Sequence, residues 1–140
     1  MLTMIFLFIC LYLCGFSNAL LGIGSRQSVS VQGTLLCDGQ PADGVLVKLY
    51  DDNTLTLDDL LAEGNTNSQG QFQLTGKIRD ITSMDPKVDL FHNCHNSILR
   101  CSKKVVIYIP HSAVNNGETY SIGTIELASD FQGQTHDCIH

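Results

Sequence analysis

The sequence lacks several features that would place it in a common class of protein. It has no Asn-x-Ser/Thr sequon, so N-glycosylation is not expected. It has no run of basic residues, and with 8 Lys and Arg against 14 Asp and Glu its formal net charge is −6. An acidic chain of this kind is a poor candidate for nucleic-acid binding. Beyond residue 19 it also has no apolar segment near the roughly 20 residues that span a bilayer.

The first nineteen residues are typical of a secretory signal peptide. Residues 2–16 are almost wholly apolar, and Ser17 and Ala19 then place small residues at the −3 and −1 positions of a cleavage site. Neither Lys nor Arg precedes the apolar run, so an uncleaved signal anchor is the alternative. We expect residues 1–19 to be removed and residues 20–140 to form one secreted domain without a transmembrane segment.

The remaining chain is a series of short, strand-like segments separated by turns. Val29 and Val31 alternate with polar neighbours within residues 28–37, which is the pattern of a half-buried strand. Similar segments occupy residues 45–52, 71–77, 88–94, 104–109 and 119–127, with turn residues at 38–44 and 67–70. Residues 55–64 fit either a short strand or a helix capped by Asp58, and we favour a short strand or a single turn. About seven short strands and no sustained helical period predict an all-β sandwich.

Four cysteines follow the cleavage site, namely Cys37, Cys94, Cys101 and Cys138. An even number of cysteines in a secreted domain predicts disulfides, and four allow three pairings. A turn between Cys94 and Cys101 would let one strand reverse into the next, so that these two cysteines meet. We therefore expect Cys94 to pair with Cys101 and Cys37 with Cys138.

Two clusters combine histidine with cysteine, HNCHNSILRC at 92–101 and HDCIH at 136–140. On a strand, His92 and Cys94 would share a face that His95 does not, and neither cluster completes a four-ligand zinc site by itself. A cysteine in a disulfide is neither a thiolate ligand nor a nucleophile. The sequence therefore predicts no metal, no cofactor and no catalytic residue, with the histidines on the surface and titrating near pH ~6.5.

The acidic pairs do not predict a catalytic or calcium site either. Asp51-Asp52 and Asp58-Asp59 are adjacent residues, which point to opposite faces of a strand and cannot converge on one atom. Residues 65–70, NTNSQG, have the amide skeleton of a calcium loop but none of its carboxylates.

One cluster of basic residues occurs in the chain, made of Arg100, Lys103 and Lys104. The ordinary interpretation is a set of solvated strand residues. The alternative is a recognition patch for an acidic partner or a lipid headgroup on an otherwise acidic surface.

Four segments, VQGTLLCDGQPADGVLVKLYDD, DDLLAEGNTNSQGQFQLTG, FHNCHNSILRCSKKVVIYIP and YSIGTIEL, follow one another in an order and spacing that resemble the nematode transthyretin-like family. The resemblance runs from about Val29 to Cys138. It implies a small secreted antiparallel β-sandwich of the prealbumin-like type. Asn67 stands where the family usually has Asp, and Asn supports the same turn. Family members are mostly described as extracellular, with diverse or unassigned roles.

The resemblance leads to three functional hypotheses. We favour a secreted, monomeric binding or bridging module whose partner is an extracellular protein, a cell surface or a lipid headgroup. The second is a small-molecule carrier like transthyretin, which requires a tetramer. The third is a hydrolase of the hydroxyisourate type, which ends in Tyr-Arg-Gly-Ser. Here the chain ends in Asp137-Cys138-Ile139-His140 and has no histidine near Val29–Val31, so we do not expect an enzyme.

Overall fold

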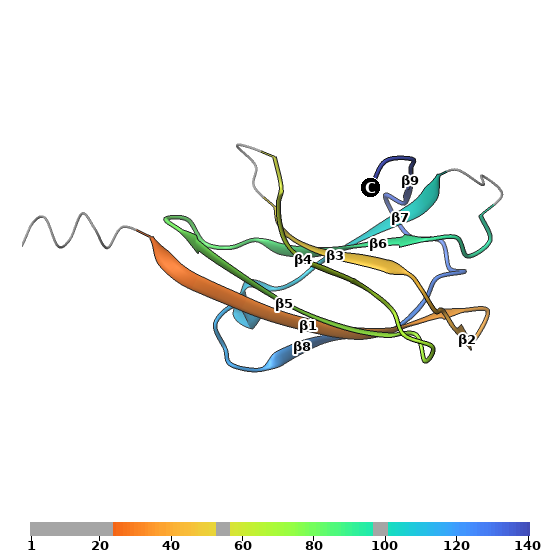
Figure 1. Cartoon of the computed structure of the whole chain (residues 1–140), viewed down its shortest axis with the longest axis horizontal. Coiled ribbons are helices and arrows are strands. Elements are labelled where there is room, and N and C mark those ends of the chain that lie inside the picture. The colour runs from red at the N-terminus through yellow and green to blue at the C-terminus, as the bar shows by residue number, and fades with distance from the viewer. Residues whose placement is uncertain (1–23, 53–56, 97–100) are drawn as a thin grey trace, which may run out of the picture.

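The computed structural model describes residues 24–52, 57–96 and 101–140. These residues form two β-sheets packed face to face, which confirms the predicted all-β sandwich (Figure 1). The elements are β1 (Ser25–Cys37), β2 (Gln40–Pro41), β3 (Leu46–Asp51), β4 (Asp59–Asn65), β5 (Gln71–Asp80), β6 (Pro86–His92), β7 (Ser102–Tyr108), the 3₁₀ turn η1 (His111–Ala113), β8 (Thr119–Glu126) and β9 (Thr135–Asp137). Sheet A contains β1, β2, β5 and β8, and sheet B has the order β4-β3-β6-β7-β9.

The core between the sheets follows from the alternation seen in the sequence. Val29, Val31 and Leu35 of β1 are buried, while the residues between them are at least partly exposed. The same alternation holds along β3 and β5, and it packs apolar side chains from both sheets into one cluster. Each such side chain contributes about 1.5–3 kcal/mol when it is fully buried. Of the short strand or single turn expected within residues 55–64, the structure forms a strand, β4, which begins at Asp59.

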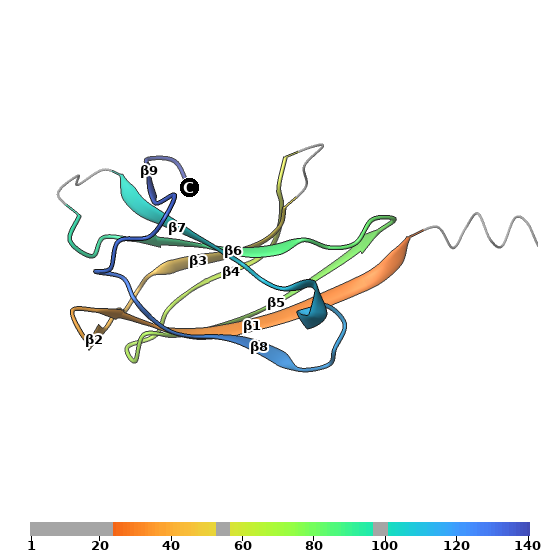
Figure 2. The same cartoon turned by 180° about the vertical axis from the view of Figure 1, so that it is seen from behind.

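Sheet A contains one parallel pair within a sandwich whose other described strand pairs are antiparallel. β8 runs parallel to β1, with Ser30 opposite Thr119 and Leu36 opposite Glu126. Asn115 holds the connection that leads into β8, because its N–H donates to the carbonyl of Ser28 and its side-chain oxygen accepts the Ser28 N–H, both at 2.8 Å. Figure 2 shows this connection and η1 at the end of the sandwich opposite β2.

The chain after β8 forms an additional short strand, β9. β9 pairs with β7, with Ser102 opposite Asp137 and Lys104 opposite Thr135. Residues 127–137 thus return from sheet A to the edge of sheet B. Among the described residues no helix is long and apolar enough to cross a bilayer.

Candidate functional site

The turn between β1 and β2 forms the centre of one end of the sandwich. Cys37 pairs with Gln40, so Asp38 and Gly39 are the two central residues, with φ of 53° and 75°. Positive φ at both positions defines a type I′ turn, and Asp-Gly is one of the pairs that favour it. The tight reversal places the Asp38 side chain directly after Cys37 at the surface.

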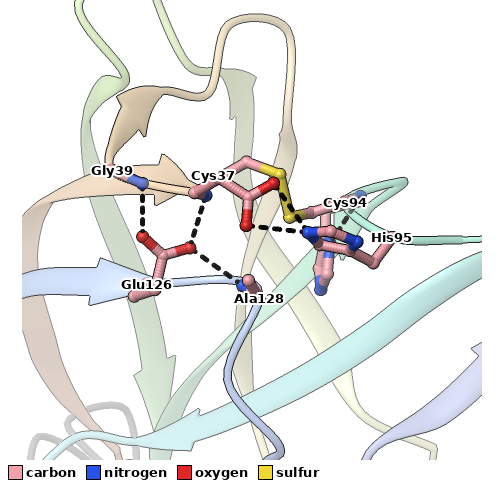
Figure 3. The surroundings of a disulfide bond; sticks show 8 residues. Cys37, Gly39, Cys94, His95, Glu126 and Ala128 are labelled. Atoms are coloured by element: carbon pink, nitrogen blue, oxygen red, sulfur yellow. Dashed lines mark hydrogen bonds and ion pairs between the residues drawn. A yellow bond between two sulfur atoms is a disulfide. The ribbon is translucent and has the colours of Figure 1, made fainter.

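Glu126, the last residue of β8, binds this turn through backbone hydrogen bonds (Figure 3). Its carboxylate accepts the N–H of Ala128 at 3.0 Å, that of Gly39 at 2.8 Å and that of Asp38 at 2.9 Å. These backbone donors, Ala128 foremost, lower the pKa of the Glu126 carboxyl. The hydrogen bonds fix the turn against the end of β8.

His95 lies on the other side of the same turn. Its backbone has a φ of 50°, and its Nε2 lies 2.8 and 2.7 Å from the two carboxylate oxygens of Asp38. Both side chains are more than half exposed, so the interaction is an ion pair at the surface when the imidazole is protonated. Figure 3 shows the His95 imidazole beside the disulfide of Cys37 and Cys94.

The disulfide in this corner joins Cys37 to Cys94, so the predicted pairing of Cys94 with Cys101 is wrong. β6 ends at His92, and the chain then turns, with the N–H of Asn96 donating to the carbonyl of Asn93 at 3.2 Å. Because the β6–β7 ladder stops before Cys94, that cysteine leaves the hairpin and faces the end of β1. The bond therefore connects sheet A to sheet B.

The second disulfide joins Cys101 to Cys138, so the predicted pairing of Cys37 with Cys138 is also wrong. β7 and β9 form the antiparallel pair Ser102–Asp137, and Cys101 and Cys138 lie one step beyond it. The strand β9, which the sequence analysis did not expect, thus explains the pairing. We call this end the cystine end: the β1–β2 turn, residues 93–96, residues 127–138 and the two disulfides.

His92 is buried, which contradicts the expectation that all the histidines lie on the surface. Its side chain accepts the N–H of Cys94 at Nδ1, at 3.1 Å, and only 2% of the residue is exposed. Burial, with a smaller effect of Lys103, lowers its pKa from 6.5 to about 4. Nε2 has no hydrogen-bond partner among the described residues. The imidazole is therefore neutral at physiological pH.

Three potential metal ligands meet at the cystine end. The sulfur atoms of Cys37 and Cys94 and a ring nitrogen of His95 all lie within 4.8 Å of one another. Sequence reasoning placed Cys94 and His95 on opposite faces of a strand, but the turn after β6 brings them together. In the oxidised chain the two sulfur atoms bond to each other, so their capacity to bind a cation depends on the disulfide.

Comparison with known proteins places this architecture in a family. The model of the transthyretin-like family matches residues 32–110. The chain is also 45% identical over 133 residues to transthyretin-like protein 5 of Caenorhabditis elegans, covering 91% of this chain and 96% of that protein. The chain belongs to the transthyretin-like family. Transthyretin-like protein 33 of the same nematode is 42% identical over 130 residues, which cover 86% of this chain and 91% of that protein.

A solved structure gives only a weak likeness to this transthyretin-like chain. A 9R-lipoxygenase from Cyanothece matches with a TM-score of 0.47 and 18% identity, over 71% of this chain and 16% of that one.

The basic residues Arg100, Lys103 and Lys104 of the transthyretin-like chain do not lie together, as far as the structure describes them. Arg100 lies outside the described residues. Lys103 and Lys104 are consecutive residues of β7 and project to opposite faces of sheet B. Accordingly, Lys103 contributes to the lowered pKa of His92, whereas Lys104 opposes the rise in the pKa of Asp89. These two lysines do not form one continuous patch.

The outer face of sheet B carries a charged cluster that sequence reasoning did not find. Lys87 lies 2.7 Å from Asp58 and 3.8 Å from Asp89, and its ammonium group is 5.5 Å from the centre of the Tyr50 ring. Asp89 is 3% exposed, and burial raises its pKa. The alternation of β6 in the sequence could have suggested that Lys87 and Asp89 lie on the outer face of the sheet. That both residues are nevertheless buried depends on the neighbouring strands, which the sequence pattern does not reveal.

The two acidic pairs, Asp51-Asp52 and Asp58-Asp59, behave largely as expected, because the two carboxylates within each pair do not meet at one site. Asp51 is buried and accepts the N–H of Asp85 at 2.9 Å. One contact joins the two pairs: burial and a side-chain hydrogen bond with Asp58 raise the pKa of Asp52. This arrangement is explained by the cluster around Lys87 and requires no substrate.

Proposed function

We propose that this transthyretin-like chain is a secreted, non-catalytic binding module that engages an extracellular partner through its cystine end. The observation that carries the proposal is the convergence of both disulfides on that end. One joins the two sheets and the other joins β7 to the tail. Together they support the turn, the segment after β6 and the chain after β8, which lie at the same end in Figure 1.

Secretion is supported by the chemistry of the chain. Disulfides persist in oxidising compartments and are rare in the cytosol, and the chain begins with nineteen residues typical of a signal peptide. N-terminal sequencing of the secreted protein should therefore begin at Leu20. A membrane-bound product that begins at Met1 would contradict this part of the proposal.

Binding through the cystine end is supported by its rigidity. Loops carried by a rigid scaffold are the usual location of binding residues, and loops that are already ordered lose less entropy when a partner binds. Here Glu126 holds the β1–β2 turn through the backbone N–H groups of Asp38 and Gly39, and Asp38 binds His95. The surface therefore has a defined shape before a partner arrives.

The test is affinity capture from extracellular fluid and cell surfaces of the source organism, with oxidised residues 20–140 as bait. Gln40→Arg/Asp130→Arg changes exposed residues at the cystine end. The control, Ser83→Arg/Glu118→Arg, changes exposed residues at the opposite end by the same net charge. We expect the control to retain the captured partner and the cystine-end variant to lose it. Retention by both variants, or loss by both, would overturn the assignment of the surface.

Native mass separates this proposal from a carrier of the transthyretin type, which requires a channel between subunits. We expect a monomer by native mass spectrometry. A tetramer that binds a small molecule at its centre would replace the binding module with a carrier.

A further inference from the structure

The Cys37–Cys94 disulfide has a potential metal ligand, the side chain of His95, beside it. A ring nitrogen of His95 lies within 4.8 Å of both sulfur atoms. Figure 3 shows the His95 side chain next to the disulfide. Among the described residues, no comparable third ligand accompanies the sulfur atoms of Cys101 and Cys138. Two cysteine sulfurs and one imidazole are the protein ligands of a known class of zinc site, whose fourth position is taken by water or substrate.

Asp38 supplies the second feature of such a site. A metal-bound histidine usually directs its other ring nitrogen to a carboxylate, which orients the ring and makes it a better ligand. Asp38 binds Nε2 of His95 at 2.7 Å and so orients the ring beside the two sulfur atoms. The four residues therefore include both the ligands and the group that orients one of them.

We propose that reduction of the Cys37–Cys94 disulfide creates a binding site for Zn²⁺ or another thiophilic divalent cation. The ligands are the sulfur atoms of Cys37 and Cys94 and one ring nitrogen of His95, and Asp38 is a positioning residue. The oxidised chain does not bind at this site, because its sulfur atoms are bonded to each other. The site goes beyond the proposed binding function, which uses the oxidised protein.

A phosphine is the reductant that breaks the Cys37–Cys94 disulfide. The S–S bond breaks, the phosphine takes the oxygen of one water molecule and becomes a phosphine oxide, and the two protons of that water go to the sulfur atoms. When the cation binds, each thiol releases its proton to solvent. Affinity should therefore increase with pH, because the cysteines bind the cation as thiolates.

The surroundings keep the ligands close together after the S–S bond is broken. Cys37 ends a strand that pairs with β5 over ten residues, and Glu126 holds the turn that follows. The backbone N–H of Cys94 donates to Nδ1 of the buried His92 side chain. The site thus forms from residues that are already near one another.

The experiment isolates this disulfide with a pair of matched variants. Cys101→Ala/Cys138→Ala retains the proposed site, whereas Cys37→Ala/Cys94→Ala retains the same number of cysteines without it. Both are reduced with the phosphine and titrated with Zn²⁺ against a chromophoric chelator, and with Cd²⁺ to record its thiolate charge-transfer absorption. We expect the first variant to bind one cation at least about 10-fold more tightly than the second. Equal affinities would mean adventitious thiol binding only and would overturn the proposal.

Two further changes test the roles of the neighbouring residues in the first variant. His95→Ala removes a ligand, and Asp38→Asn retains a side chain of similar size; each should weaken binding by about 10-fold or more. Unchanged affinity in His95→Ala would overturn the ligand assignment. Where reduction unfolds the first variant, stoichiometric Zn²⁺ should restore its folded circular dichroism spectrum and leave that of the second unchanged. Failure to restore it would also overturn the proposal.

Discussion

His92 provides a prediction about stability and pH that follows directly from its burial. The folded protein holds this imidazole neutral, with a pKa lowered from 6.5 to about 4. In the unfolded chain the imidazole is solvated and titrates near 6.5. As the pH falls below 6.5 the unfolded state takes up a proton that the folded state does not, so protonation favours unfolding. The contribution of His92 to stability is therefore complete above about pH 6.5 and is lost as the pH falls towards 4.

The size of the effect follows from the separation of the two pKa values. Each unit of separation corresponds to about 1.36 kcal/mol, so the full effect is about 3 kcal/mol. Between about pH 7.5 and about pH 5 the loss should be about 2 kcal/mol, since the folded state is still largely unprotonated at the lower value. Asp89 acts in the opposite direction, because its raised pKa makes the folded state bind a proton more readily.

Urea unfolding of the wild type and of His92→Gln at both pH values isolates this contribution. Glutamine supplies a side-chain acceptor for the Cys94 N–H and does not titrate, so contributions from Asp89 and other carboxyls cancel in the comparison. The wild type should lose about 2 kcal/mol more than the variant on acidification. His136→Gln, which changes an exposed histidine, should behave as the wild type does. Equal losses in the wild type and His92→Gln would refute the burial argument.

Three further predictions concern the scaffold. The disulfides close separate loops spanning 57 and 37 residues, so Cys37→Ala/Cys94→Ala and Cys101→Ala/Cys138→Ala should each lower the free energy of unfolding by about 4 kcal/mol, and the losses should add. A loss below about 1 kcal/mol for either pair in urea unfolding would contradict this reasoning. Gly70→Ala should lower the thermal unfolding temperature more than Gly117→Ala does. Both glycines have positive φ, but only at Gly70 would a Cβ meet the Leu35 carbonyl. Equal decreases in the two variants would count against that contact. Lys87→Met leaves Asp89 buried beside an apolar side chain and should cost about 3 kcal/mol, whereas adding Asp89→Asn should recover most of the loss; no recovery would show that the charge is not responsible.

Local patterns predicted most of the fold. The alternation around Val29 and Val31 identified a strand whose inner face is buried, and turn residues marked where strands end. Asn67 also behaves as expected, since its side-chain oxygen accepts the N–H groups of Gln69 at 3.0 Å and Gln71 at 2.9 Å. These features depend on neighbouring residues in the chain, so they can be recognised from the sequence.

The structure of the cystine end could not be predicted from the sequence, because it depends on contacts between distant residues that no local pattern reveals. A hairpin that continued past His92 would have brought Cys94 towards Cys101, which was the geometry behind the predicted pairing. The ladder stops instead, and β9, a short polar segment without strand-like alternation, occupies the edge of β7 opposite Cys101. The burial of His92 has the same origin, because it depends on what packs around the end of β6.

Non-reducing tryptic peptide mapping of the secreted protein tests the architecture of the cystine end most directly. Trypsin cleaves after Arg26, Lys48, Lys87, Arg100 and Lys104, so the four cysteines fall on four different peptides. We predict one linked pair that contains Cys37 and Cys94 and a second that contains Cys101 and Cys138. Peptides that link Cys37 to Cys138 and Cys94 to Cys101, or free thiols in the secreted protein, would contradict the assigned structure of this end and the binding surface built on it.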